Sequence, residues 1–133
     1  MTESQVKALF LFNFAKYVSW PAGAFSETNA PLVIGVIGQS KLAADLKSAA
    51  TGKSIIGHPV RVVEPKNGAE WAQCHVLFID ASEKEHLQEI ILKVKNLPVL
   101  TVGESDLFQV AGYSGRVLVR KSAPVVEAAM RAR

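Results

Sequence analysis

The chain has 133 residues, of which 49% are hydrophobic and 20% charged, and its formal net charge is +3. This length and composition predict one folded domain over residues 1–133 and exclude a disordered chain, because there is enough apolar surface to form a core. No apolar run reaches the ~18 residues of a membrane span, so we expect no direct membrane insertion. The basic excess lies in residues 116–133 without interleaved aromatic side chains, so we expect no nucleic-acid partner.

The first predicted element is an apolar helix that Thr2 and Gln5 can begin as a capping box and that Pro21 ends. Successive helical residues are about 100° apart, so the apolar side chains surround this helix and one surface cannot bury them all. We therefore predict that part of it forms a dimer or partner surface. The residues assigned to that surface are Leu9, Phe12, Lys16 and Trp20.

The apolar helix is interpreted as mature sequence and not as a secretory signal. A signal peptide has a basic start and a small-residue cleavage site. Here Glu3 precedes the apolar run, and Trp20 and Pro21 follow it.

Short apolar runs alternate with helical patterns through the rest of the chain. Continuous runs such as residues 32–38 are typical of strands buried on both faces. The order predicts an α/β fold, a mostly parallel sheet with helices on both faces. Further strands are predicted at 60–63, 74–79, 98–103 and 116–120, and helices at 40–50, after 82 and at 125–131.

The sequence also indicates where some of these helices begin and where the sheet ends. Ser40, and Ser82 with Glu85, are expected to cap the two helices that follow them. Pro124 suits the first position of the last predicted helix. The strand at 116–120 has an arginine at each end, which predicts an edge of the sheet near the C-terminus.

Two positions resemble parts of catalytic or nucleotide-binding sites. Gly35 and Gly38 lie between a strand and a helix, but the third glycine and the acid of a dinucleotide site are missing, which favours a tight turn. Asp80 ends a predicted strand, where receiver-type domains carry their phosphoacceptor. No acid follows the first strand to hold Mg²⁺, so the simpler interpretation is a turn residue; a degenerate phosphoacceptor remains an alternative.

The histidines and the cysteine predict no metal site. His58, His75 and His86 lack the spacing of zinc ligands, and neighbouring strand residues such as Cys74 and His75 point to opposite faces. Cys74 is the only cysteine, so it forms no internal disulfide and is expected to be buried. We predict no catalytic residues, no metal and no cofactor.

A series of motifs then resembles the YfiR/HmsC-like family of periplasmic proteins. The segments that carry the resemblance are Phe14–Pro21, Ile34–Gly38, Gly52–Val60, Cys74–Ile79 and Pro98–Val102, in the family's order and at sensible spacing. The C-terminal part departs from the family pattern, because the segment after residue 117 reads Leu-Val-Arg-Lys-Ser in place of a strand that ends Glu-Ile-Asn.

The resemblance implies regulation and not catalysis. It implies a periplasmic protein, expected to be a homodimer, that binds and represses the extracytoplasmic region of a membrane diguanylate cyclase. Release of the cyclase would raise cyclic di-GMP and favour biofilm formation. The alternative is a small-ligand-binding sensory domain of a signalling receptor, with a pocket near Trp20, Trp71 or the carboxyl ends of the strands.

Overall fold

The computed structural model describes residues 2–16, 20, 23–103, 117–122 and 125–130. The strands are β1 (Leu32–Ile37), β2 (Ser54–Ile55), β3 (His58–Val63), β4 (Val76–Ile79), β5 (Leu100–Gly103), β6 (Val117–Ser122) and β7 (Val125–Met130). The helices are α1 (Glu3–Lys16), α2 (Ser40–Ala50), α3 (Gly68–Trp71), a 3₁₀ helix (Ala81–His86) and α4 (Leu87–Val94).

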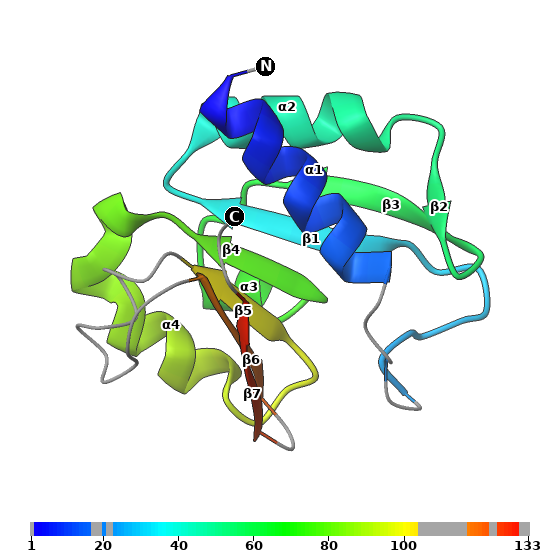
Figure 1. The fold of residues 1–133 in the computed structure, drawn as a ribbon. Coiled ribbons are helices and arrows are strands. Elements are labelled where there is room, and N and C mark those ends of the chain that lie inside the picture. The colour runs from blue at the N-terminus through cyan, green and yellow to red at the C-terminus, as the bar shows by residue number, and fades with distance from the viewer. Residues whose placement is uncertain (1, 17–19, 21–22, 104–116, 123–124, 131–133) are drawn as a thin grey trace.

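These strands form one seven-stranded sheet in the order β2-β3-β1-β4-β5-β6-β7 (Figure 1). The four central strands, β3, β1, β4 and β5, pair in parallel, whereas β2, β6 and β7 pair antiparallel to their neighbours. In β1, Ile34 lies opposite Val62 on one side and Val76 on the other. The predicted α/β fold with a mostly parallel sheet is confirmed.

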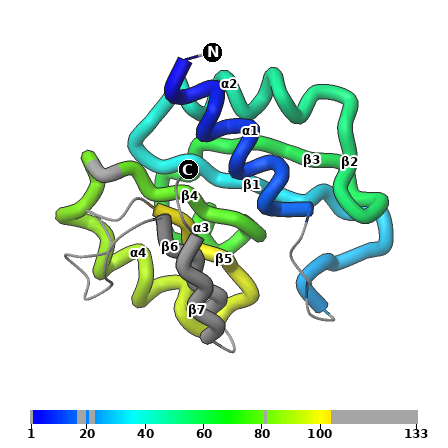
Figure 2. Tube along the Cα trace, viewed as in Figure 1, coloured from blue at the N-terminus to red at the C-terminus, as the bar shows by residue number. Residues whose placement is uncertain are grey.

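Helices cover both faces of the sheet, as predicted. Figure 2 shows α1 and α2 together over β1 and β3, and α4 beside the other half of the sheet. Because side chains alternate along a strand, the central strands contribute to a separate core on each face. In β4, Val76 and Phe78 join the core under α1 and α2, while Leu77 and Ile79 join the core under α4.

The start of α1 follows the sequence prediction. The Thr2 backbone N–H donates to Gln5 Oε1 at 2.8 Å, and the Gln5 N–H donates to Thr2 Oγ1 at 3.2 Å, so the capping box is confirmed. The helix packs against α2, and the Ser4 hydroxyl donates to the Asp45 carboxylate between them. The structure describes α1 to Lys16, and the predicted end at Pro21 lies outside the described residues.

Two predicted caps are wrong. Ser40 is the first residue of α2, Gln39 occupies the cap position without a side-chain hydrogen bond, and the Ser40 hydroxyl donates to Glu64 Oε1 at 2.7 Å. Before the 3₁₀ helix, the cap is Asp80, whose carboxylate accepts from the Ser82 N–H at 3.0 Å. In both places the cap lies one or two residues earlier than the serine predicted for it.

The C-terminal part differs most from the prediction. The expected helix over 125–131 is wrong, because Val125–Met130 is strand β7, with Ser122 paired to Val125. β-branched Val125 and Val126 favour a strand, and pairing with β6 satisfies backbone groups that a short exposed helix would leave to water. The sheet does have an edge near the C-terminus, but the edge is β7 and not the strand predicted at 116–120. The role predicted for Pro124 lies outside the described residues.

Gly35 allows close packing in the middle of β1. A Cβ atom at this position would lie 2.6 Å from Cys74 Sγ and 3.0 Å from Leu77 Cδ1. The Cys74 side chain is buried, so it has little room to move away. The absence of a side chain on Gly35 is therefore what lets the loop before β4 approach β1.

We predict that Gly35→Ala lowers the free energy of unfolding by about 1–3 kcal/mol, the usual cost of overpacking a core. Removing the sulfur in Gly35→Ala/Cys74→Ala should recover part of that loss, because the closest clash disappears. Urea unfolding of the wild type, both single variants and the double variant measures the coupling. Strictly additive effects would show that the contact with Cys74 does not limit residue 35.

Candidate functional site

The outer side of α1 is the first candidate surface. Ala8, Leu11, Phe12 and Ala15 are buried against the sheet and α2. The opposite side carries residues three and four positions apart that are half-buried or exposed. This outward strip of α1 consists of Val6, Leu9, Phe10, Asn13 and Lys16.

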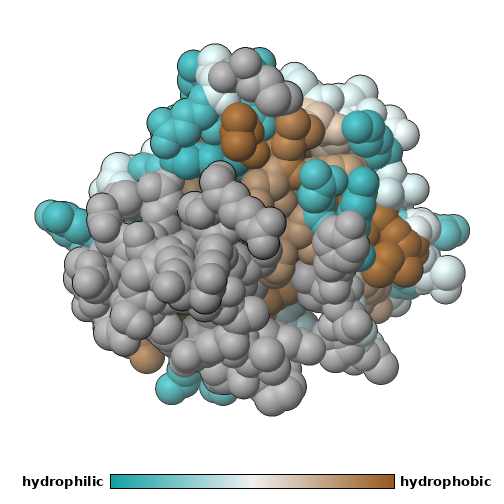
Figure 3. Space-filling view, viewed as in Figure 1, coloured by the Kyte–Doolittle hydropathy of each residue, from teal (hydrophilic) through white to brown (hydrophobic). Residues whose placement is uncertain are grey.

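The outward strip is partly apolar. Val6 is 53% exposed, and Leu9 and Phe10 are half-buried. The Phe10 ring also stacks on Phe14, with 6.3 Å between ring centroids. Figure 3 shows hydrophobic surface over α1, next to hydrophilic side chains. A strip of this kind can add apolar contact area to a partner.

The structure places the predicted partner residues differently. Leu9 and Lys16 lie in the outward strip, whereas Phe12 is only 3% exposed and belongs to the core. Lys16 Nζ is 4.9 Å and Lys53 Nζ 5.5 Å from the centroid of the Phe12 ring, so two ammonium groups lie near it. Phe12 thus helps to anchor α1, and any partner would meet the lysines beside it.

Trp20 lies in an aromatic cluster at the amino end of the central strands. The cluster consists of Trp20, Phe25, His58 and His75. The Phe25 ring is stacked between the two imidazoles, with centroid distances of 3.7 Å to His58 and 4.4 Å to His75. The Trp20 ring meets His75 edge to face at 5.6 Å. This cluster was missed by sequence reasoning, because its members lie far apart in the chain and share no periodicity.

Both histidines of the aromatic cluster hold the loop that precedes β1. His75 Nδ1 accepts from the Val33 N–H at 3.0 Å, so the proton of the neutral ring is on Nε2, which donates to the Ala24 carbonyl at 2.7 Å. His58 Nδ1 donates to the Ala30 carbonyl at 2.6 Å. The two rings therefore fasten both ends of the loop segment 24–30 to the sheet.

The environment of His75 favours its neutral form. Burial lowers the pKa of His75 below its usual value, the hydrogen bond to the Ala24 carbonyl partly opposes this, and nearby His58 adds to the lowering. Protonation of Nδ1 would also displace the Val33 N–H. Both ring nitrogens of His75 are thus hydrogen-bonded to backbone groups, so neither is free to bind a metal.

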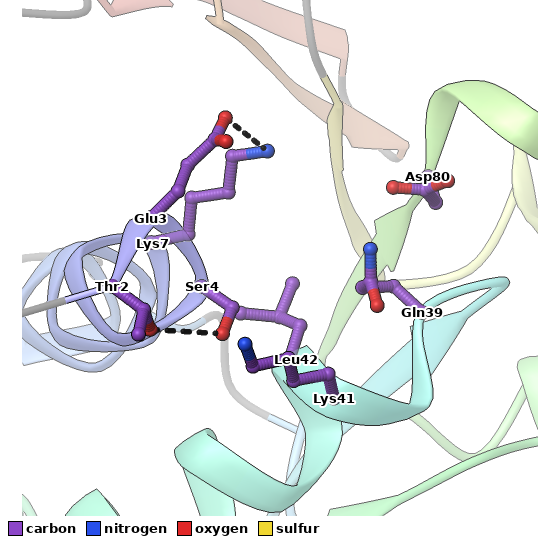
Figure 4. A pocket seen from close by; sticks show the side chains of 8 residues that line it. All are labelled: Thr2, Glu3, Ser4, Lys7, Gln39, Lys41, Leu42 and Asp80. Atoms are coloured by element: carbon purple, nitrogen blue, oxygen red, sulfur yellow. Dashed lines mark hydrogen bonds and ion pairs between the residues drawn. The ribbon is translucent and has the colours of Figure 1, made fainter.

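A second candidate site lies at the opposite, carboxyl end of the sheet, between β1 and β4 (Figure 4). From β1 the chain continues to β3 on one side of the sheet and then returns to β4 on the other side. Ligands commonly bind to α/β folds at such a point, beyond the carboxyl ends of the two strands. A cavity of about 190 Å³ opens between the N-termini of α1 and α2. Its charged lining is balanced, with two acids and two lysines: Glu3, Asp80, Lys7 and Lys41.

Three of the charged groups of this cavity have partners in the structure. Lys7 Nζ lies 3.3 Å from Glu3 Oε1, and the Asp80 carboxylate accepts from the Ser82 N–H. The residues that follow β1 are Gly38, Gln39 and Ser40, with no acid beside Asp80 for a metal ion. The geometry therefore favours Asp80 as a turn residue over the phosphoacceptor alternative.

Trp71 lies apart from Trp20. It packs against the core on the α4 side of the sheet, whereas Trp20 packs against the core on the α1 side. The structure therefore does not bring the two tryptophans into one pocket. Trp71 instead lines two cavities of about 380 Å³ each near the carboxyl ends of β1 and β3.

Cys74 has the properties of a buried, unreactive thiol. Burial raises its pKa to about 12, with a smaller contribution from the Glu70 carboxylate. Its Sγ donates a long 3.5 Å hydrogen bond to the Glu70 carbonyl. Across the part of the chain that the structure describes, no three His, Cys, Asp or Glu side chains are grouped as a metal site requires.

The chain was compared with models of known protein families and with curated proteins. The model of the YfiR/HmsC-like family matches residues 4–117. The chain belongs to this family. The match ends at the first residue of β6, where the sequence departs from the family pattern. No curated protein matches the chain significantly.

Membership of the YfiR/HmsC-like family gives a general class of function. Proteins of this family are regulatory and not catalytic, and the family is periplasmic. Among the described helices, none has the length and hydropathy to cross a bilayer.

We predict that His75 makes folding stability fall on acidification. Because its pKa is lower in the folded chain than in the unfolded chain, its contribution is complete above about pH 6.5, the unfolded value. The contribution is lost as pH falls from there through the folded pKa. His75→Gln, which does not titrate, should therefore show a shallower loss of melting temperature between pH 7 and pH 5.

The matched control for this pH experiment is Gln88→Asn, since Gln88 is exposed on α4 and does not titrate. It should keep the wild-type pH dependence. Equal slopes for His75→Gln and the wild type would contradict the assigned role of His75.

Proposed function

We propose that this chain is a non-enzymatic periplasmic regulator that binds the extracytoplasmic region of a membrane diguanylate cyclase and holds the cyclase inactive. The observation that carries the proposal is the match of the YfiR/HmsC-like family over residues 4–117. Loss of the complex would raise cyclic di-GMP and favour biofilm formation. Residues 1–133 would act as one domain in this role.

The outward strip of α1 supports a role through protein contacts. It combines exposed Val6 and half-buried Leu9 and Phe10 with the cation of Lys16 at its end. Apolar centres with a charged rim are typical of protein interfaces. We assign the cyclase contact to this strip, extending from Leu9 to Lys16 and towards Trp20.

The mechanism is preferential binding to one conformation of the cyclase. A regulator shifts a conformational equilibrium only by the difference between its affinities for the two states. Coupling of this kind is usually about 1–3 kcal/mol, which is enough to change the active fraction several-fold or more. No chemical step on the regulator is needed.

Calorimetric titration into the purified extracytoplasmic region of a membrane diguanylate cyclase from the same organism tests the proposal. We predict saturable binding by the wild type. Leu9→Glu should weaken it about ten-fold or more, because a buried apolar contact is replaced by an unpaired charge. Leu9 is only half-buried in the free chain, so the variant is expected to fold.

Leu92→Glu is the matched control. Leu92 is on α4, across the sheet from α1, and is 61% exposed. This variant should bind like the wild type. A well-folded wild-type chain that does not bind would remove the proposal, whereas binding that is weakened by Leu92→Glu and not by Leu9→Glu would move the interface to α4.

The same strip is available to a second copy of the chain, and we propose a homodimer as the resting form. Sedimentation of the chain alone, over a range of concentrations, distinguishes this state from a monomer. A dimer that Leu9→Glu dissociates would place both contacts on α1. A monomer at all concentrations would rule out the homodimer.

A further inference from the structure

The turn between β2 and β3 carries an isoleucine where the backbone is left-handed. Ile55 pairs with His58, so the two strands are connected by the two-residue turn Ile56-Gly57. The φ angles of these two residues are +52° and +81°. Positive φ at both central residues is the conformation of a type I′ turn, whose twist matches that of the flanking strands. β2 is the outermost strand on this side of the sheet, so the turn lies at the sheet edge (Figure 1).

Ile56 is poorly suited to this turn. Asparagine, aspartate and glycine usually take the first position of a type I′ turn, because a left-handed φ brings the Cβ of other side chains close to the following carbonyl oxygen. For a β-branched residue a φ of +52° is an outlier. The Ile56 side chain is also 67% exposed, so its burial does little to offset the strain. Folding therefore gains little from an isoleucine at this position.

The residues on either side hold the turn in its strained conformation. Ile55 is 3% exposed and belongs to the core under α1 and α2. The His58 ring stacks on Phe25 and donates to the Ala30 carbonyl. A strained backbone persists only where the surrounding contacts determine it, and such strain is concentrated at functional sites. The strain at Ile56 therefore points to a function of its side chain outside the fold.

Two lysines connect this turn with the outward strip of α1. Lys53 directly precedes β2, and its Nζ is 5.5 Å from the centroid of the Phe12 ring. The Nζ of Lys16, at the end of the outward strip, is 4.9 Å from the same centroid. Both lysines are exposed. The β2–β3 hairpin thus continues the surface of the outward strip, and two cations lie where the hairpin meets α1.

We propose that Ile56 is an anchor that enters an apolar pocket of the partner, and that carboxylates beside this pocket pair with Lys16 and Lys53. The partner is the extracytoplasmic region of the cyclase, so this role of Ile56 rests on the proposed function. A few side chains that fill well-packed pockets usually provide most of the affinity of an interface. A turn that is already rigid before binding also loses little conformational freedom in the complex.

Ile56→Asn is the test variant, and its stability and its binding should change in opposite directions. Asparagine suits the first position of a type I′ turn, so the melting temperature should rise by about 2–6 °C. Calorimetric titration into the extracytoplasmic region of the cyclase should show binding about ten-fold weaker than that of the wild type, because the anchor is lost. A residue that served only the fold would not separate stability from binding in this way.

Two further variants test the charge and the position of the contact. Lys53→Gln should weaken binding and make it less dependent on salt, because one ion pair is lost. Leu92→Asn is the matched control, since it exchanges another exposed aliphatic side chain for the same amide on α4, across the sheet from α1. This control should bind the cyclase like the wild type.

The assigned role of Ile56 is overturned if folded Ile56→Asn binds the cyclase like the wild type, or if this variant is less stable than the wild type. It is also overturned if the substitution dissociates a homodimer and leaves cyclase binding unchanged, because the pocket would then belong to a second copy. In each case the wild type binds and Leu9→Glu weakens binding, so the proposed function stands. A wild-type chain that does not bind the cyclase removes the proposed function, and this contact with it.

Discussion

The structure depends on the burial of β1 on both faces and on both edges. This strand pairs in parallel with β3 and β4, and its side chains enter the core under α1 and α2 and the core under α4. With no exposed side, β1 fixes the relative positions of both helical layers. The turn that follows it, at Gly38, brings the 3₁₀ helix close to the carboxyl end of the sheet.

The arrangement around β1 keeps three surfaces apart. The aromatic cluster of Trp20, Phe25, His58 and His75 closes the amino end of the strands, and the cavities near Asp80 and Trp71 lie at the carboxyl end. The outward strip of α1 lies along one face.

Local signals predicted the central sheet but not its C-terminal part. Runs such as residues 32–38 are continuous and apolar because those strands are buried on both faces, so sequence and environment agree. Residues 125–130 are also apolar except for Glu127, but they form a strand by pairing with β6, and this pairing leaves no mark on the periodicity of the sequence. Phe12 was assigned to a partner surface although it is buried, and the reason is again that local pattern did not report the packing. α1 is apolar all round, so the sequence alone did not indicate which side would face the sheet.

The composition of α1 also has a consequence for the order in which the chain folds. This helix is synthesised before the segments that cover its buried side, because those segments are α2 and the central strands, which follow it in the chain. Apolar side chains lie on every side of α1, so those on its buried side stay uncovered until these segments have followed. The nascent chain is therefore most prone to aggregate early in synthesis, before β1 and α2 emerge.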